Sequence, residues 1–355
     1  MCSSDLAKES IRLCRRAGIV PVMITGDHLT TAQSIAKDLG IYEPDQGHKV
    51  LSGKELDLID EEKLVEQIED VRVYARVAPE QKLRIVNAWQ RKEHVVAMTG
   101  DGVNDAPALQ RADIGVAMGV TGSDVSRSSA DLILMDDDFS TIVTAVEEGR
   151  GIFENIRRTV GYLLSCNLGE LLLILTAVIL GMPVPLLPVQ ILWVNLVSDA
   201  LPALALGVEP SERNVMMRPP RPLQEGILTK RKIFLIFFDG LIIAGIAFVA
   251  YQFGMMESVE AARTMSFLTI GFSQLVHAFN ARSRGSIFNR NLFANTSFYL
   301  AVIVSGMMLF LVGFIPVLQP IFNVVPIDFA QWIFVAGLSV IPLVVSEIRK
   351  IFIQG

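Results

Sequence analysis

The sequence predicts a Rossmann-like α/β domain followed by an all-α bundle of six transmembrane helices. Up to about Arg158, charged residues are frequent and short apolar runs alternate with helical patterns. Beyond Arg158, long runs carry few or no charges. With 51% hydrophobic residues and a mean hydropathy of +0.46, the 355-residue chain is too apolar for an ordinary soluble protein. We therefore expect one domain over residues 1–150 and a membrane domain over residues 151–355.

Composition excludes several other classes of protein. The net charge is -6 and the basic residues form no single patch, so we expect no nucleic-acid partner. The three cysteines, Cys2, Cys14 and Cys166, lack a C-x-x-C spacing. This argues against a disulfide framework or a zinc site and fits a reducing, cytosolic compartment. The N-terminus has no apolar segment of the kind found in secretory signal peptides.

In the first domain, strands and helices are expected to alternate along the chain, which is typical of a parallel, doubly wound sheet. Pro79 suits a first helical turn, and Gly40 suits the end of a helix. The predicted strands are Ile19–Ile24, Val71–Ala75, Val95–Met98, Ile114–Met118 and Leu132–Met135. The predicted helices are Thr30–Leu39, Pro79–Arg91, a short helix through Leu109, and Ser123–Ser129.

Two acidic turns, Thr25-Gly26-Asp27 and Thr99-Gly100-Asp101, follow predicted strands. Ligands of open α/β sheets bind at the carboxyl ends of strands, so we expect Thr25, Asp27, Asp101 and Asp105 at one sheet edge. The second turn continues through Asn104 and Asp105, whose oxygens suit Mg²⁺ and, through it, phosphate. Lys82 is the natural cation to steady a phosphoryl group there, although a single lysine can equally be a solvated surface residue.

These segments resemble the phosphorylation domain of P-type cation-transporting ATPases, members of the haloacid dehalogenase superfamily. The resemblance rests on Met23–Asp27, Tyr74–Lys82, Thr99–Pro107 and Ala112–Gly119, and it continues to the C-terminus. It implies that Asp101 binds Mg²⁺ and that Lys82 contacts phosphate. It also implies that Thr25, Gly26, Asp27 and Arg76 line the phosphate path of ATP, and that Asn104 and Asp105 support the site.

Two features depart from the family pattern. The Asp-Lys-Thr-Gly-Thr segment that carries the family's phosphorylated aspartate does not occur, and Met1–Leu6 does not match the expected residues. We therefore expect the C-terminal part of a longer pump whose start is artificial. The nucleotide-binding insertion, the actuator domain and four membrane helices would lie upstream. The intact protein would be an ATPase, whereas this chain alone would not hydrolyse ATP.

Six segments beyond Arg158 are long and apolar enough to span a bilayer. They are 160–180, 187–206, 233–253, 264–281, 297–317 and 329–345. A helical pattern starts after Asp136–Asp138 and continues past Arg158, so one helix is expected to enter the bilayer from the first domain. It could carry domain rotation to the membrane site, as the resemblance implies.

Positive charge orients these segments. Basic residues fill alternate loops, namely Arg213, Arg218, Arg221 and Lys230–Lys232, then Arg282, Arg284 and Arg290, then Arg349 and Lys350. Residues 1–158 and the C-terminus are therefore expected in the cytosol of a bacterial-type cell, with the bundle in the plasma membrane. The loop Gly207–Arg221 fits a family connection that docks on the phosphorylation domain; it can also be a basic loop stiffened by proline.

Polar residues inside the spans indicate an ion site. Asn167 and Glu170 share one helical face, and Asn195, Ser198 and Asp199 share another. A carboxylate in the bilayer is costly unless it is paired, so Glu170 and Asp199 are expected to be cation ligands or proton carriers. Pro202 removes the backbone hydrogen bond to the Ser198 carbonyl, which frees another oxygen. The alternative is interhelical polar contact without an ion.

Tyr162–Glu170 and Leu192–Asp199 resemble the fifth and sixth membrane helices of type II pumps, above all calcium pumps of the sarcoplasmic reticulum class. In those pumps the matching residues coordinate Ca²⁺. Gln274 stands at the position where two-site calcium pumps carry a glutamate, and sodium pumps carry a glutamine at a comparable place. Gln274 is therefore a further candidate ligand. His277 is expected to pack or hydrogen bond rather than bind an ion.

The resemblance implies an ATP-driven pump that exports Ca²⁺ through an aspartyl-phosphate, with the lipid bilayer and the transported cation as partners. A pump for Na⁺ or another monovalent cation is the first alternative. A membrane-anchored phosphatase without transport is a second, but it needs a nucleophilic aspartate that residues 1–20 do not offer. The third is a truncated membrane module with no activity.

Overall fold

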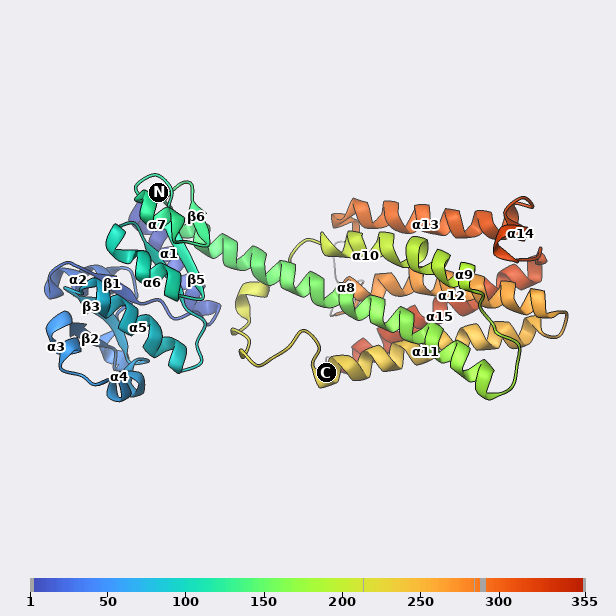
Figure 1. The fold of residues 1–355 in the computed structure, drawn as a ribbon, viewed down its shortest axis with the longest axis horizontal. Coiled ribbons are helices and arrows are strands. Elements are labelled where there is room, and N and C mark those ends of the chain that lie inside the picture. The colour runs from blue at the N-terminus through green and yellow to red at the C-terminus, as the bar shows by residue number, and fades with distance from the viewer. Residues whose placement is uncertain (1–2, 213, 284, 288–291, 354–355) are drawn as a thin grey trace. The chain divides into compact units, whose positions relative to one another are not determined.

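The computed structural model describes residues 3–212, 214–283, 285–287 and 292–353 (Figure 1). The chain divides into two compact units. The first contains residues 1–150 and 212–225, and the second contains residues 151–211 and 226–355. Cys2, Arg213, Arg284 and Arg290, which entered the sequence analysis, lie outside the described residues.

The first unit is an α/β domain with two three-stranded parallel sheets. One has the strand order β1-β3-β2 and the other β4-β5-β6. The strands are β1 Met23–Thr25, β2 Lys49–Ser52, β3 Val71–Ala75, β4 Ala97–Gly100, β5 Ile114–Met118 and β6 Leu132–Leu134. The helices are α1 Ser3–Arg16, α2 Leu29–Asp38, η1 Pro44–Gln46, α3 Gly53–Asp57, α4 Glu61–Gln67, α5 Pro79–Arg91, η2 Val103–Asp105, α6 Ala106–Arg111 and α7 Asp124–Ser128.

The predicted single doubly wound sheet is wrong in one respect. β1 and β4 are both edge strands, and among the described residues no backbone ladder joins them. Helix α5 packs against both sheets instead: Ile85 belongs to the core that covers β3, and Val86 packs with Met98 of β4. Ile24 of β1 contacts both of these clusters. The two sheets therefore share a core although they do not share hydrogen bonds.

Most predicted elements of this unit exist, and the boundary errors have physical reasons. The first strand begins at Met23 rather than Ile19, since Pro21 in this run cannot donate to a ladder. β2, α3 and α4 were not predicted, although two of them carry clear caps. Ser52 and Glu55 form a capping box at α3, and Asp60 caps α4.

The segment 212–225 packs within the first unit although it follows the membrane helix that ends at Gly207. Val215 and Met216, in η4 (Val215–Met217), are buried against Cys14, Ala17 and Val143. The Arg150 guanidinium donates to the carbonyl oxygens of Ala17 at 2.9 Å, Arg218 at 2.9 Å and Val215 at 3.2 Å. This segment is thus held by both apolar burial and charge-assisted hydrogen bonds.

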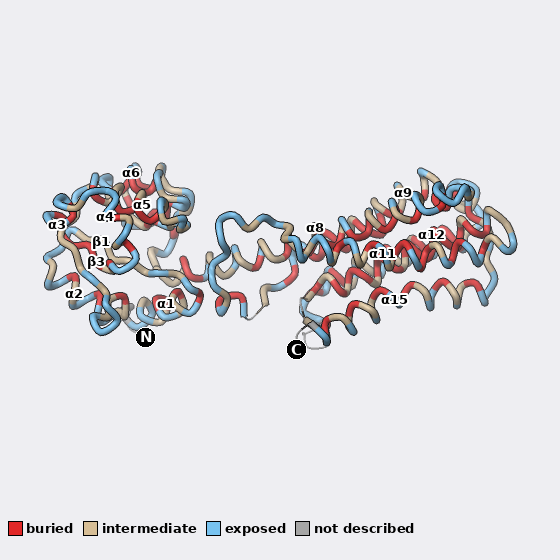
Figure 2. The backbone as a smooth tube through the Cα atoms, turned by 90° about the horizontal axis from the view of Figure 1, so that it is seen from below, coloured by how far each residue is buried: buried red, intermediate tan, exposed pale blue. Residues whose placement is uncertain are grey.

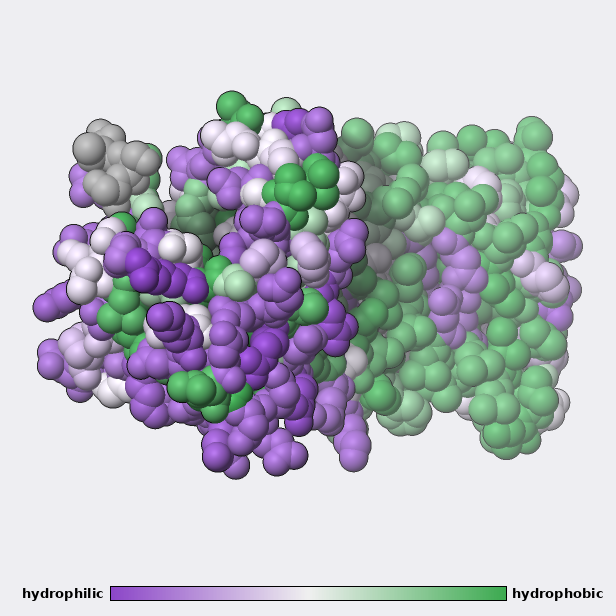
Figure 3. Space-filling model, turned by 60° about the vertical axis from the view of Figure 1, so that its left-hand side comes forward, coloured by the Kyte–Doolittle hydropathy of each residue, from purple (hydrophilic) through white to green (hydrophobic). Residues whose placement is uncertain are grey.

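The described part of the second unit contains helices and no strands. On the face drawn in Figure 3 it is mainly hydrophobic, whereas the first unit is mainly hydrophilic. Its helices are α8 Phe139–Ile179, which begins in the first unit, then α9 Pro188–Trp193, η3 Val194–Asp199, α10 Ala200–Gly207, α11 Lys230–Gly254, α12 Val259–Ala281, η6 Leu292–Ala294, α13 Thr296–Phe314, α14 Gln319–Phe322 and α15 Phe329–Ile353. All six predicted spans are therefore helical. The second span is continuous from Pro188 to Gly207, with a π-helical turn over Val194–Asp199.

Five of these spans are apolar and long enough to cross a membrane: α8, Pro188–Gly207, α11, α13 and α15. Within the described chain α12 is the predicted span that falls short. Sixteen of its 23 residues are buried, so it is an inner helix whose neighbours shield it from lipid (Figure 2). Its buried face includes Thr269, Ser273, Gln274, His277 and Asn280, and these polar side chains lower its hydropathy.

Candidate functional site

Lys82 and Asp105 form an ion pair in the first unit. Pro79 starts α5, which places Lys82 in its first turn, and η2 presents Asp105. The Lys82 ammonium contacts the Asp105 carboxylate, and their side chains are only 17% and 8% exposed. Asp105 also accepts a hydrogen bond from the Gly102 amide at 3.3 Å. The interpretation of Lys82 as a solvated surface lysine is therefore wrong.

The Asp101 carboxylate lies at the surface where β4 ends. The Asp101 carbonyl accepts hydrogen bonds from the Ser123 amide at 2.8 Å and the Ser126 hydroxyl at 3.0 Å, so the backbone is anchored. No donor in the described part of the chain bonds to its carboxylate, which leaves it open to a ligand. Gly100 is required here, because a Cβ atom would lie 2.5 Å from Cβ of Asp105. Asn104 is exposed beside this turn.

Thr25, Asp27 and Arg76 meet where β1 and β3 end. The Thr25 hydroxyl donates to the Asp27 carboxylate at 3.0 Å and accepts from the Asp27 amide at 3.1 Å. The Arg76 amide donates to the Asp27 carbonyl at 3.1 Å, and the Arg76 side chain contacts His28. Gly26 is exposed within this turn. No hydrogen bond between described residues joins this group to Asp101 or Asp105.

In the second unit, two membrane segments bring polar side chains to Glu170 of a third. Glu170 of α8 is buried; one carboxylate oxygen accepts from Gln274 Nε2 of α12 at 3.0 Å, and the other accepts from Asn195 Nδ2 of η3 at 3.4 Å. Asp199, at the end of η3, is buried, and one of its carboxylate oxygens accepts from the Tyr162 hydroxyl of α8. Hydrogen bonds therefore join Glu170, Asn195 and Gln274, and Asp199 lies in the same π-helical turn as Asn195.

Several oxygens in this cluster lack a protein partner. One Asp199 oxygen accepts from the Tyr162 hydroxyl at 3.2 Å. Among the described residues, the other Asp199 oxygen, the Ser198 hydroxyl and the Gln274 amide oxygen are buried without a hydrogen bond. Buried oxygens of this kind are costly unless something binds them, so the donor set fits a cation. We name Glu170, Asn195, Ser198, Asp199 and Gln274 the membrane cluster.

Two predictions for this region turn out differently in the structure. Asn167 shares the Glu170 helix but is exposed, and no hydrogen bond between described residues joins it to the membrane cluster. The Ser198 carbonyl, expected to be free because of Pro202, is approached by the Tyr162 hydroxyl at 3.5 Å. The Val197 carbonyl, which lies within the π-helical turn, accepts from the Ser305 hydroxyl at 2.6 Å.

His277 behaves as a hydrogen-bonding residue. Ser165 donates to the Tyr162 carbonyl at 2.8 Å, so the 3.0 Å contact of Ser165 with His277 Nε2 places the imidazole proton on Nε2. The His277 ring also stacks on Tyr162. Tyr162 and Ser305 were not predicted as site residues, because their partners lie 37 and 108 residues away and no local spacing indicates them.

The chain matches two family models. Residues 3–113 match the haloacid dehalogenase-like hydrolases, and residues 183–352 match the C-terminus of cation-transporting ATPases. The chain is 47% identical to the calcium-transporting ATPase of Bacillus subtilis over 94% of its length and 45% identical to calcium-transporting ATPase 1 of Bacillus cereus over 97%. It is 41% identical to human calcium-transporting ATPase type 2C member 1, again over 97% of its length.

This chain belongs to the P-type cation-transporting ATPases. It spans 38% of the Bacillus subtilis relative, 40% of the Bacillus cereus relative and 37% of the human one. The fold agrees with this family, since a haloacid dehalogenase-like α/β unit precedes membrane helices.

Proposed function

We propose that this chain provides the cation-binding membrane helices and part of the phosphoryl-binding domain of an ATP-driven pump that exports Ca²⁺. The observation that carries the proposal is the membrane cluster. Two buried carboxylates lie with amide and hydroxyl oxygens, and three of these oxygens have no partner within the described residues. Such oxygens have a function in a transport site, and a phosphatase without transport would not need them.

The chemistry of the cluster favours Ca²⁺. Among described residues, no group of three or more His, Cys, Asp or Glu side chains could hold a metal. The membrane cluster has two carboxylates, Glu170 and Asp199, and its other side-chain oxygens are neutral. Ca²⁺ accepts about six to eight oxygen ligands in flexible geometry, including amides and carbonyls. Gln274 contributes no charge, so a monovalent cation is the alternative that an experiment must exclude.

In the first unit, we propose that Asp101 holds Mg²⁺ and that Lys82 contacts the phosphate. When bound, Mg²⁺ would neutralise phosphate charge. Asp105 fixes the Lys82 ammonium through the ion pair, and Thr25, Gly26, Asp27, Arg76 and Asn104 would line the path of the ATP phosphates. The exposed Asp101 carboxylate supports this role, because nothing among the described residues competes for it.

The pump is an integral membrane protein, and we propose that residues 1–158 and the C-terminus face the cytosol of a bacterial plasma membrane. Helix α8 supports a coupling role, since it runs unbroken from Phe139 through Glu170. A phosphorylation event that moves the start of this helix would act on a cation ligand further along it.

Ion-stimulated phosphorylation of the full-length protein tests the proposal. With ATP supplied, we expect phosphoenzyme to form in micromolar Ca²⁺ and to disappear when Ca²⁺ is chelated. Phosphorylation that depends on Na⁺ and not on Ca²⁺ would overturn the choice of ion. Hydrolysis that depends on no ion would favour the phosphatase.

A further inference from the structure

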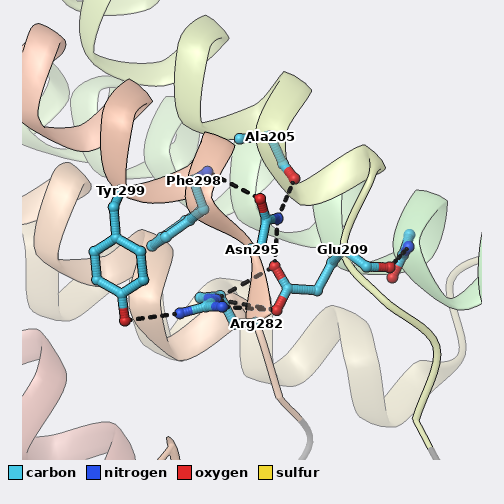
Figure 4. A network of polar contacts seen from close by, with 7 residues as sticks. Ala205, Glu209, Arg282, Asn295, Phe298 and Tyr299 are labelled. Carbon is cyan, nitrogen blue, oxygen red and sulfur yellow. Dashed lines mark hydrogen bonds and ion pairs between the residues drawn. The ribbon is translucent and has the colours of Figure 1, made fainter. Parts of the chain in front are cut away.

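A buried ion pair joins the ends of two membrane helices outside the membrane cluster (Figure 4). Glu209 follows α10, and Arg282 closes α12. Arg282 donates to the Glu209 carboxylate from Nη2 at 2.9 Å and from Nε at 3.1 Å. The Arg282 side chain is 3% exposed and the Glu209 side chain is 0% exposed, so this pair is buried away from water.

Two asparagines extend the pair to further helices. Asn295 caps α13 by accepting from the Phe298 amide at 3.0 Å, and it donates to the Glu209 carboxylate at 2.7 Å and to the Ala205 carbonyl at 2.9 Å. Asn155 of α8 donates to the Glu209 carbonyl. We call Glu209, Arg282, Asn295 and Asn155 the Glu209 clamp.

Aromatic residues of α13 enclose the Arg282 side chain. The guanidinium lies 4.6 Å from the centre of the Phe298 ring, and Nη1 donates to the Tyr299 hydroxyl at 3.3 Å. Figure 4 shows Arg282 between Tyr299 and Glu209, with Asn295 reaching both Glu209 and Ala205. The clamp therefore has directional contacts from four helices and leaves little freedom to slide.

We propose that the Glu209 clamp positions the cation ligands of the membrane cluster, an inference that rests on the proposed transport function. Each of three clamped helices carries a ligand: Glu170 follows Asn155 on α8, Asp199 precedes Glu209, and Gln274 precedes Arg282. At 1.5 Å per residue, Gln274 lies about 12 Å and Asp199 about 15 Å from the clamp along their helices. Glu209, Arg282, Asn295 and Asn155 are positioning residues and do not touch the ion.

The need for a clamp follows from the π-helical turn that carries Ser198 and Asp199. A π turn interrupts the regular hydrogen-bond ladder, and such turns often occur at functional sites that move. The short α10, only eight residues long, follows it directly. Its axial position is therefore set at its C-terminal end, where Glu209 and the Ala205 carbonyl meet Asn295 and Arg282.

Loss of the charge on Glu209 or Arg282 should loosen the C-terminal end of α10, because the remaining buried charge would then attract water or move toward it. The matched control is the Asp239–Arg349 pair, which joins α11 to α15. Its side chains are also mostly withdrawn from water, at 13% and 20% exposed, but α11 and α15 carry no residue of the membrane cluster. A general effect of losing an ion pair would be seen at both places.

The experiment uses the full chain in lipid nanodiscs and compares Glu209→Gln, Arg282→Met and Asp239→Asn. Amide hydrogen exchange over residues 194–206 should rise at least tenfold in the two clamp variants and less than twofold in Asp239→Asn. Half-saturation by Ca²⁺ should shift at least tenfold upward in the clamp variants only. The double variant Glu209→Gln with Arg282→Met removes both charges of this pair and should shift less than the two single shifts combined.

Equal exchange in Glu209→Gln and Asp239→Asn would overturn the inference. If the unchanged chain binds no Ca²⁺, the proposed function fails, while hydrogen exchange still decides whether the clamp fixes α10. If Glu209→Gln does not fold, Glu209→Asp replaces it, since it keeps the charge and shortens the side chain. Exchange equal to that of the unchanged chain would then contradict the inference.

Discussion

Replacing Arg150 with methionine should release the segment 212–225 from the first unit. The Arg150 guanidinium donates to three backbone carbonyls, two of which, Val215 and Arg218, belong to this segment. The third, Ala17, belongs to the surface on which the segment packs. Methionine keeps much of the apolar contact of the side chain and removes all three hydrogen bonds.

The size of the effect follows from these contacts. A hydrogen bond to a charged donor contributes about 1.5–3 kcal/mol, and neighbouring contributions do not add fully. We therefore expect the segment to lose about 2–4 kcal/mol of docking free energy, and the apolar contacts of Val215 and Met216 to remain. At about 1.4 kcal/mol per factor of ten, the released population should rise roughly 30- to 700-fold.

Limited proteolysis by thermolysin measures this population. Thermolysin cuts before bulky apolar residues, and Val215 and Met216 are buried at 6% and 9% exposure, so cleavage there requires release. When opening is fast relative to cleavage, the rate of cutting follows the released population. The matched control is Arg12→Met. Among the described residues Arg12 forms only an exposed pair with Glu9, so this variant should change cleavage less than threefold.

A rise below threefold in Arg150→Met would refute this reasoning. It would mean that the apolar contacts of η4 alone hold the segment. Equal acceleration in Arg12→Met would show that any loss of positive charge loosens the unit, and the three carbonyl contacts would then not explain the docking.

Three further changes test other parts of the account. Gly18→Ala should also speed thermolysin cleavage of residues 212–225, because Gly18 has φ +71° and its Cβ would lie 2.6 Å from Cδ of Pro220. Lys82→Met should lower the thermal stability of the first unit, followed by Trp89 fluorescence, by about 2–4 kcal/mol, because Asp105 would be left as a buried unpaired charge. Ser305→Ala should weaken Ca²⁺ binding about tenfold, since a carbonyl within the π-helical turn loses a donor.

Each of these has a control and an opposing result. Gly47 has φ +80° with nothing within 4 Å of a Cβ, so Gly47→Ala carries the strain without the clash and should leave cleavage unchanged. The double variant Lys82→Met with Asp105→Asn should recover part of the lost stability; no recovery would contradict the ion-pair explanation. Unaltered Ca²⁺ binding in Ser305→Ala would mean that the π-helical turn does not depend on that hydroxyl.

Local patterns in the sequence predicted most of the fold. The strands Val71–Ala75 and Ile114–Met118 and the helix Pro79–Arg91 match the structure at both ends, because buried apolar runs and a proline at the first turn are local signals. β2 was missed because its four residues are only partly buried or exposed and give no apolar run. The division into two sheets was missed because the pairing of strands far apart in sequence leaves no local mark.

The candidate sites were predictable only in part, for the same reason. The cost of a carboxylate in the bilayer singled out Glu170 and Asp199, and the structure brings Gln274 to Glu170. Asn167 is three residues before Glu170 and so lies on the same side of the helix, yet it is exposed. Helical spacing shows which residues share a side of a helix, but it does not show which other helices cover that side. The Glu209 clamp was not predicted: its charged pair is separated by 73 residues, and Glu209 looks in sequence like an ordinary loop residue.

Equilibrium Ca²⁺ binding to the purified chain, and to the chain with Asp199→Asn, tests the central claim most directly. The account predicts saturable Ca²⁺ binding that excess Na⁺ does not displace and that Asp199→Asn weakens at least tenfold. Thermal unfolding would confirm that the variant remains folded. Absence of saturable binding in the unchanged chain, or equal affinity in a folded Asp199→Asn variant, would contradict the assignment of the membrane cluster as the Ca²⁺ site.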